Sequence, residues 1–81
     1  MASRSMFLLR FGEEVRRIRK ALGLSQEELA DIAGFDRTYI SLIERGKRNL
    51  SLTNIVRFAR ALRTTPDRLM KQVDPKYVGR D

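Results

Sequence analysis

The chain has 81 residues, of which 42% are apolar, so it is long enough for one small domain with a modest core. It contains no cysteine and no histidine, which excludes disulfides and thiolate metal sites and removes the commonest general base. Seventeen Lys and Arg against ten Asp and Glu give a formal charge of +7. This charge indicates an anionic partner, unless it only keeps the surface soluble. We expect no enzyme, no metal and no cofactor.

The first twelve residues contain an apolar run that is far shorter than the roughly 20 residues needed to cross a bilayer. They also lack the cleavage site of a signal peptide. We therefore expect a cytoplasmic protein without a membrane partner. Its expected organisation is a single domain over residues 1–81, with a core at about 10–71, a flexible N-terminal leader and a flexible C-terminal tail.

The first predicted helix covers about residues 10–22, because apolar residues recur there at helical spacing and Gly23 follows as a stop signal. The apolar residues are Phe11, Val15, Ile18 and Leu22. The basic residues between them would also suit a helix on a membrane surface, but the apolar stripe favours burial in a core. Ser25, three residues before Glu28, then gives the capping-box pattern of a second helix that ends at Gly34. Its inward residues are Leu29, Ile32 and Ala33.

Three further helices follow. Asp36 is the expected N-cap of a third helix that ends at Gly46. Ser51 caps a fourth, which runs to about Arg63. Its predicted buried stripe is Leu52, Ile55, Val56, Ala59 and Leu62. Thr65 caps a short fifth helix with Pro66 at its first position. No stretch alternates with period two for long enough to predict a strand, so the expected fold class is all-α, with five helices.

Residues 26–45 have the pattern of a helix, a turn and a second helix. Ala30 is small where the helices must approach, and Gly34 can take the positive φ of a tight turn. Ile40 and Ile43 would pack the second helix onto the first. Together these features predict a helix-turn-helix, a motif whose second helix enters the DNA major groove by its N-terminal end.

The residues opposite the two isoleucines are the expected base readers. They are Arg37, Thr38, Tyr39 and Ser41. Arg37 can donate two hydrogen bonds to O6 and N7 of guanine, and Thr38 offers a hydroxyl and a methyl group. The alternative is that they are merely exposed residues of a first helical turn.

Two groups should contact the DNA backbone on either side of these base-reading residues. One is the start of the second helix, with Ser25 and Gln26, and the other is the basic loop with Lys47, Arg48 and Asn49. The loop could also be simply solvated. Glu44 would be repelled by phosphates, so we expect it to pair with Arg19 of the first helix and to orient the recognition helix rather than add much net stability.

One recognition helix reads only a few base pairs, which predicts a homodimer on double-stranded DNA. Two-fold symmetry would place the recognition helices about 34 Å apart and require an inverted repeat. The expected dimer interface is formed by Phe58, Leu69, Met70, Val73 and Tyr77. Leu69 and Met70 could instead complete the core.

Four segments carry a family resemblance: L-S-Q-E-E-L-A, G-F-D-R-T-Y-I-S-L-I-E-R-G, S-L-T-N-I and T-P-D-R-L. Over about residues 10–71 the chain resembles the lambda-repressor/Cro-type (XRE) helix-turn-helix family, which implies a compact lambda-repressor-like domain. The run D-R-T-Y-I-S-L-I-E-R, with R-N-L-S after it, is similar to the controller proteins of restriction-modification systems.

This resemblance implies a homodimeric transcriptional regulator that binds near-palindromic operators beside its own gene and times expression of the endonuclease. It assigns base reading to Arg37 and Thr38, with Tyr39 and Ser41 beside them. Backbone contacts fall to Gln26, Arg48 and Asn49, and the internal pair to Glu44 and Arg19. The resemblance is also compatible with a tetramer on adjacent operator sites and with a contact to RNA polymerase. The alternatives are a phage-type repressor and an antitoxin that neutralises a toxin through residues 72–81.

Overall fold

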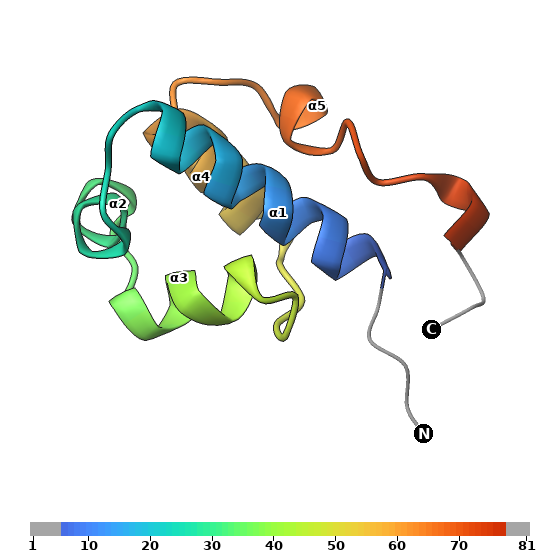
Figure 1. Ribbon diagram of the computed structural model, residues 1–81, viewed down its shortest axis with the longest axis horizontal. Coiled ribbons are helices and arrows are strands. Elements are labelled where there is room, and N and C mark those ends of the chain that lie inside the picture. The colour runs from blue at the N-terminus through green and yellow to red at the C-terminus, as the bar shows by residue number, and fades with distance from the viewer. Residues whose placement is uncertain (1–5, 78–81) are drawn as a thin grey trace.

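The computed structural model describes residues 6–77, except for the side chain of Tyr77. The described chain consists of helices joined by short loops and has no strand, so the all-α prediction is confirmed (Figure 1). The elements are α1 (Met6–Ala21), α2 (Gln26–Ala33), α3 (Arg37–Glu44), α4 (Leu52–Ala61), α5 (Pro66–Leu69) and a 3-10 turn η1 (Pro75–Tyr77). Within residues 6–77 no helix is long and apolar enough to cross a bilayer.

The long helix α1 organises the fold. It packs against α3 on one side and α5 on the other, while α2 packs against both α3 and α4 (Figure 1). The short helix α3 is therefore held by two different helices. Its first turn is exposed at Arg37 and Thr38.

The sequence pattern predicted that the first helix begins near residue 10, but α1 begins at Met6. The added turn packs on the loop after α3, where a Cβ at the buried Gly46 would lie 2.9 Å from Leu9, and its Phe7 and Leu8 line an apolar groove together with Leu50. The other end of the helix also corrects the prediction. Leu22 lies beyond the last helical residue and is 42% exposed instead of buried.

The predicted capping residues occupy the predicted places. The Ser25 hydroxyl accepts from the Glu28 amide at 2.9 Å, and the Glu28 carboxylate accepts from the Ser25 amide at 2.8 Å, which confirms the capping box. Ser51 caps α4 by accepting from the Asn54 amide at 3.1 Å. Asp36 stands at the N-cap position of α3, but its side chain makes no capping hydrogen bond there.

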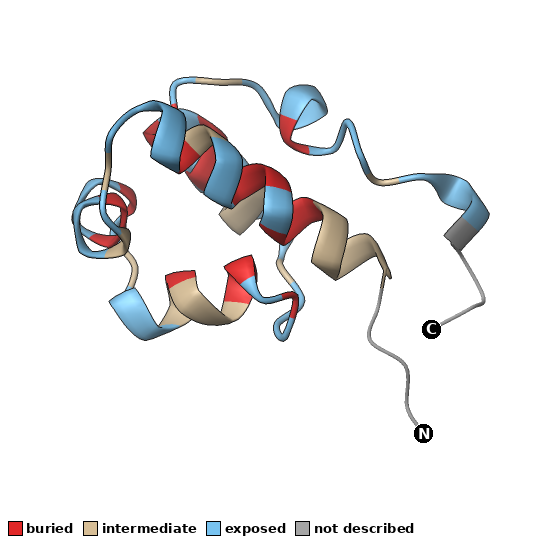
Figure 2. Cartoon of the chain, in the orientation of Figure 1, coloured by how far each residue is buried: buried red, intermediate tan, exposed pale blue. Residues whose placement is uncertain are grey.

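Helix α4 buries Ala59 and Leu62 as predicted, with Ile55 partly buried beside them, but the centre of its buried face is shifted toward Phe58. Phe58 is fully buried, whereas Leu52 and Val56 are exposed, as is Ile32 of α2 (Figure 2). The ring of Phe58 meets the rings of Phe11 and Phe35 at 6.3 and 4.9 Å between centroids. Filling the space between α1, α2 and α4 with this large ring fixes the rotation of α4.

This rotation corrects the predicted dimer interface. Phe58 and Leu69 each have 0% exposed surface, so neither side chain can reach a partner. Met70 remains exposed and Val73 is half-buried against the core. The side chain of Tyr77 lies outside the described residues.

Candidate nucleic-acid interface

Helix α3 is anchored by the residues that the sequence predicted. Ile40 and Ile43 are 0% and 1% exposed. On the other side of the helix, Arg37 and Thr38 stand exposed on its first turn, and Ser41 is half-buried one turn later. The helix therefore offers a guanidinium and a hydroxyl to an approaching ligand at its N-terminal end, where the peptide dipoles add positive potential.

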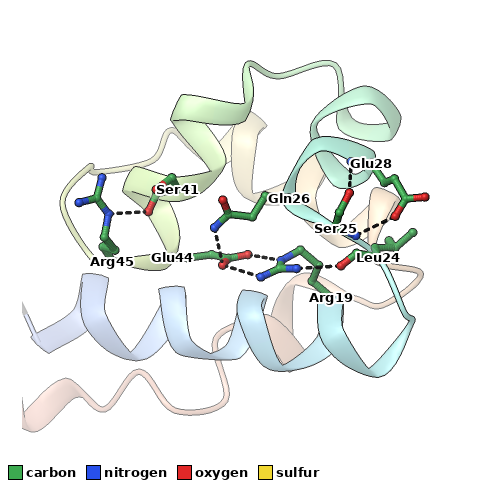
Figure 3. A network of polar contacts seen from close by, with 8 residues as sticks. All are labelled: Arg19, Leu24, Ser25, Gln26, Glu28, Ser41, Glu44 and Arg45. Carbon is green, nitrogen blue, oxygen red and sulfur yellow. Dashed lines mark hydrogen bonds and ion pairs between the residues drawn. The ribbon is translucent and has the colours of Figure 1, made fainter.

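The other end of α3 is fixed by the predicted ion pair, which is confirmed (Figure 3). Arg19 Nε and Nη2 donate to the two oxygens of Glu44 at 2.6 and 3.0 Å. Both side chains are nearly inaccessible, at 8% and 3% exposed. Arg19 Nη1 also donates to the Leu24 carbonyl at 2.7 Å, so the guanidinium joins α1, the turn before α2 and α3. No buried side-chain nitrogen or oxygen in residues 6–77 lacks a hydrogen-bond partner.

Gln26 belongs to the same network, which its predicted role as a phosphate contact did not anticipate. Its Nε2 donates to Glu44 Oε1 at 3.1 Å, so one of its two N–H groups is used inside the protein (Figure 3). The Ser25 hydroxyl is likewise engaged as the cap of α2. These contacts fix the start of α2 against the end of α3.

Tyr39 is half-buried, with its ring inside an aromatic cluster. Its centroid lies 4.8 Å from that of Phe35 and 6.2 Å from that of Phe58. The phenol oxygen accepts from Asn54 Nδ2 at 3.0 Å. Because Asn54 fills the acceptor side, the phenol keeps its own hydrogen for donation to a ligand. The sequence placed Tyr39 among the base readers without finding these contacts with α4.

The basic loop after α3 is exposed at Lys47, Arg48 and Asn49. The Arg48 guanidinium lies over the Tyr39 ring, 5.3 Å from its centroid, within the range of a cation–π contact. Thr38, Tyr39 and Arg48 also line one hollow beside the first turns of α3. The structure thus places Arg48, a predicted contact to the DNA backbone, next to Thr38 and Tyr39, two predicted base readers. Asn49 uses its side-chain oxygen to accept from the Leu50 amide at 2.8 Å.

Sequence reasoning missed two residues that position α3. Gly12 of α1 is buried against the end of α3, where an added Cβ would overlap the Ile43 carbonyl oxygen and lie 2.8 Å from that of Glu44. Arg57 of α4 donates to the Ala33 and Gly34 carbonyls. The only sequence signal for Gly12 was a glycine between Phe11 and the acidic pair that follows. Arg57 gave no signal, because it is one of two arginines in its helix.

These elements define a class of protein. Helices α2 and α3 meet across Gly34, which has a φ of 77°, and α3 presents its N-terminal polar residues beside a basic loop. Among residues 6–77 no three His, Cys, Asp or Glu side chains gather as metal ligands. The arrangement is that of a helix-turn-helix DNA-binding domain.

Comparison with known proteins gives the family. A helix-turn-helix family profile matches residues 15–69. The control protein C.BamHI of Bacillus amyloliquefaciens is 49% identical over 63 residues, which cover 76% of this chain and 78% of that protein. The chain belongs to this helix-turn-helix family, whose members are DNA-binding regulators and not enzymes.

Solved structures agree with this assignment. The restriction-modification controller protein C.AhdI from Aeromonas hydrophila matches with a TM-score of 0.75 and 50% identity, covering 76% of this chain and 94% of that one. The controller protein C.Esp1396I, solved as a tetramer in complex with its natural 35 base-pair operator, matches with a TM-score of 0.75 and 33% identity, covering 85% and 96%. The predicted similarity to restriction-modification controller proteins is confirmed.

Proposed function

We propose that the protein binds near-palindromic operators as a homodimer and controls expression of a restriction-modification system and of its own gene. The observation that carries this proposal is the exposed pair Arg37 and Thr38 on a helix anchored at its other end by a buried ion pair. Such a helix holds its donors in one geometry, as bidentate contacts to base edges require. The control proteins among its relatives favour control of a restriction-modification system over the functions of a phage repressor or an antitoxin.

In this proposal each group has one role. Arg37 and Thr38 read base edges, with Ser41 at the margin of the contact. Tyr39 and Arg48 bind the DNA backbone from their shared hollow, and the start of α2 binds it at the other end of α3. Lys47 and Asn49 add to the backbone contact from the exposed loop.

We place the dimer interface on the apolar groove between the start of α1 and the C-terminal segment. The groove has a volume of about 430 Å³. Its apolar lining comprises Phe7, Leu8, Phe11, Leu50, Ile55, Met70 and Val73. A second copy is its proposed occupant, because a single reader helix has too few base contacts and because a relative is solved as an assembly on its operator. This surface keeps Met70 and Val73 of the predicted interface and replaces the two buried residues.

Two further partner relations belong to the proposal. The operator-bound tetramer of C.Esp1396I supports a tetramer on adjacent operator sites for this chain as well. The protein also contacts RNA polymerase where it activates transcription. It does so in the cytoplasm.

Replacing Met70 with glutamate should disrupt dimers, since it places a charge in an apolar contact. Analytical ultracentrifugation should then show a monomer where the wild-type protein is dimeric, and affinity for an inverted-repeat duplex should fall at least about tenfold. Ile32→Glu is the matched control, because Ile32 is more exposed, at 58% against 38%, and lies on α2, away from the groove. A dimer that survives Met70→Glu, or that Ile32→Glu breaks equally, would contradict the proposed interface.

A further inference from the structure

Arg57 makes an unusual contact between α4 and the turn of the helix-turn-helix. Its Nη2 donates to the carbonyl oxygens of Ala33 and Gly34 at 2.9 and 2.8 Å. These carbonyls lie at the end of α2, where the last carbonyls of a helix have no helical partner. Arg57 therefore supplies from another helix the hydrogen bonds that would otherwise come from water or a local cap.

The same guanidinium also packs on the residue that joins the two helices. Its Cζ lies 4.1 Å from the centroid of the Phe35 ring, which is close for a cation–π contact. Phe35 in turn packs against Tyr39 of α3 at 4.8 Å. Only a planar guanidinium can stack on a ring and donate along its edge at once, so lysine cannot reproduce both contacts.

The fit around the turn is close. A Cβ at position 34 would lie 2.9 Å from Arg57 Nη2, and Gly34 has a φ of +77°. The turn backbone and the guanidinium are thus in direct contact, and a side chain at position 34 would displace the end of Arg57. Helix α3 begins at Arg37, three residues after this glycine, so a shift of the turn moves the first turn of the reader directly.

We propose that Arg57 is a positioning residue for base recognition. It fixes the turn between α2 and α3 and so sets where Arg37 and Thr38 stand, without touching the bases itself. This inference rests on the proposed function, in which α3 reads DNA. Its specific consequence is that losing Arg57 reduces discrimination between sequences more than it reduces binding to any DNA. Bidentate base contacts depend strongly on geometry, whereas phosphate contacts from flexible side chains tolerate small shifts.

The test compares Arg57→Ala with Arg57→Lys and Arg60→Ala. Arg60 is an exposed residue of the same helix, and its loss removes the same charge but no hydrogen bond to the turn. Each variant is titrated with a duplex that the wild-type protein selects from a random pool and with a scrambled duplex, at one salt concentration. Circular dichroism gives the folded fraction of each protein.

In Arg57→Ala the ratio of the two affinities should fall about tenfold, and Arg57→Lys should lose part of the ratio. Arg60→Ala should weaken binding to both duplexes alike and keep the ratio. An unchanged ratio in folded Arg57→Ala, or an equal loss in Arg60→Ala, would overturn the inference. If Arg57→Ala does not fold, Arg57→Lys decides, because it keeps the charge and an unchanged ratio there also overturns the inference. A wild-type protein that selects no sequence would instead overturn the proposed function.

Discussion

Glu44→Ala is expected to lower the free energy of unfolding by about 3–5 kcal/mol, the typical cost of removing one partner of a buried ion pair. The mutation leaves the Arg19 guanidinium buried, with the Leu24 carbonyl as its remaining partner in the network. It also removes the acceptor of Gln26 Nε2, so the start of α2 loses its tie to α3. Urea denaturation followed by circular dichroism measures the change. For a domain of this size such a loss is a large part of the total stability.

Variants that also change Arg19 distinguish the cost of an unpaired buried charge from the cost of lost packing. Arg19→Met combined with Glu44→Leu replaces the pair by apolar side chains of similar length. We expect this double variant to be more stable than Glu44→Ala, since no buried charge is left without a partner. A double-mutant cycle on Arg19 and Glu44 should show strong coupling. Simple additivity of the two single changes would contradict the role assigned to the pair.

Gly12→Ala is expected to destabilise the protein although alanine favours a helix over glycine by about 1 kcal/mol. The new Cβ would overlap the Ile43 carbonyl oxygen, and both neighbours at this point are backbone atoms that cannot rotate away. Overpacking of this kind costs about 1–3 kcal/mol and here acts where α1 crosses the end of α3. Thermal unfolding should show a lower midpoint, and binding to a specific duplex should weaken because α3 is displaced.

Gly23→Ala is the control for this substitution. Unlike Gly12, Gly23 has a positive φ, of 74°, and a Cβ there meets nothing within 4 Å, so this variant introduces backbone strain of about 1–2 kcal/mol without overpacking. That variant should unfold earlier but keep its DNA affinity while folded. A Gly12→Ala protein as stable as the wild type would show that α1 and α3 are not in the close contact that the structure gives them.

Local signals explain which parts of the fold the sequence could predict. The capping box at Ser25 and the buried pair Ile40 and Ile43 depend on residues three or four apart, so the pattern contains all the information needed. The pairing of Glu44 with Arg19 was also accessible, because a carboxylate on a surface expected to meet phosphates has to be neutralised. For these features, local chemistry and tertiary structure require the same residues.

The remaining features depend on contacts between distant residues. Phe58 lies three residues after Ile55 and four before Leu62, so a buried stripe through Phe58 was available in the sequence. The alternative stripe through Leu52 and Val56 had the same period, and only the packing of three aromatic rings decides between them. The predicted dimer interface was wrong at Phe58 for this reason.

The contacts of Arg57 and Tyr39 could be predicted from the sequence even less. Arg57 contacts a turn that lies 23 and 24 residues earlier, and nothing in its own helix distinguishes it from Arg60. The bond from Asn54 to Tyr39 spans 15 residues. Such contacts become visible only once the angle between α3 and α4 is known. The contacts of these polar side chains are therefore set by the fold rather than by the local pattern.

Selection of bound duplexes from a random pool shows whether α3 reads DNA through Arg37. The wild-type protein should enrich an inverted repeat whose half-sites lie about one helical turn apart. Arg37→Ala should enrich the same repeat with one guanine preference lost in each half-site, while Arg60→Ala, with the same change in charge, should keep that guanine. Absence of any enriched sequence with the wild-type protein, or a guanine preference that survives Arg37→Ala, would contradict the claim.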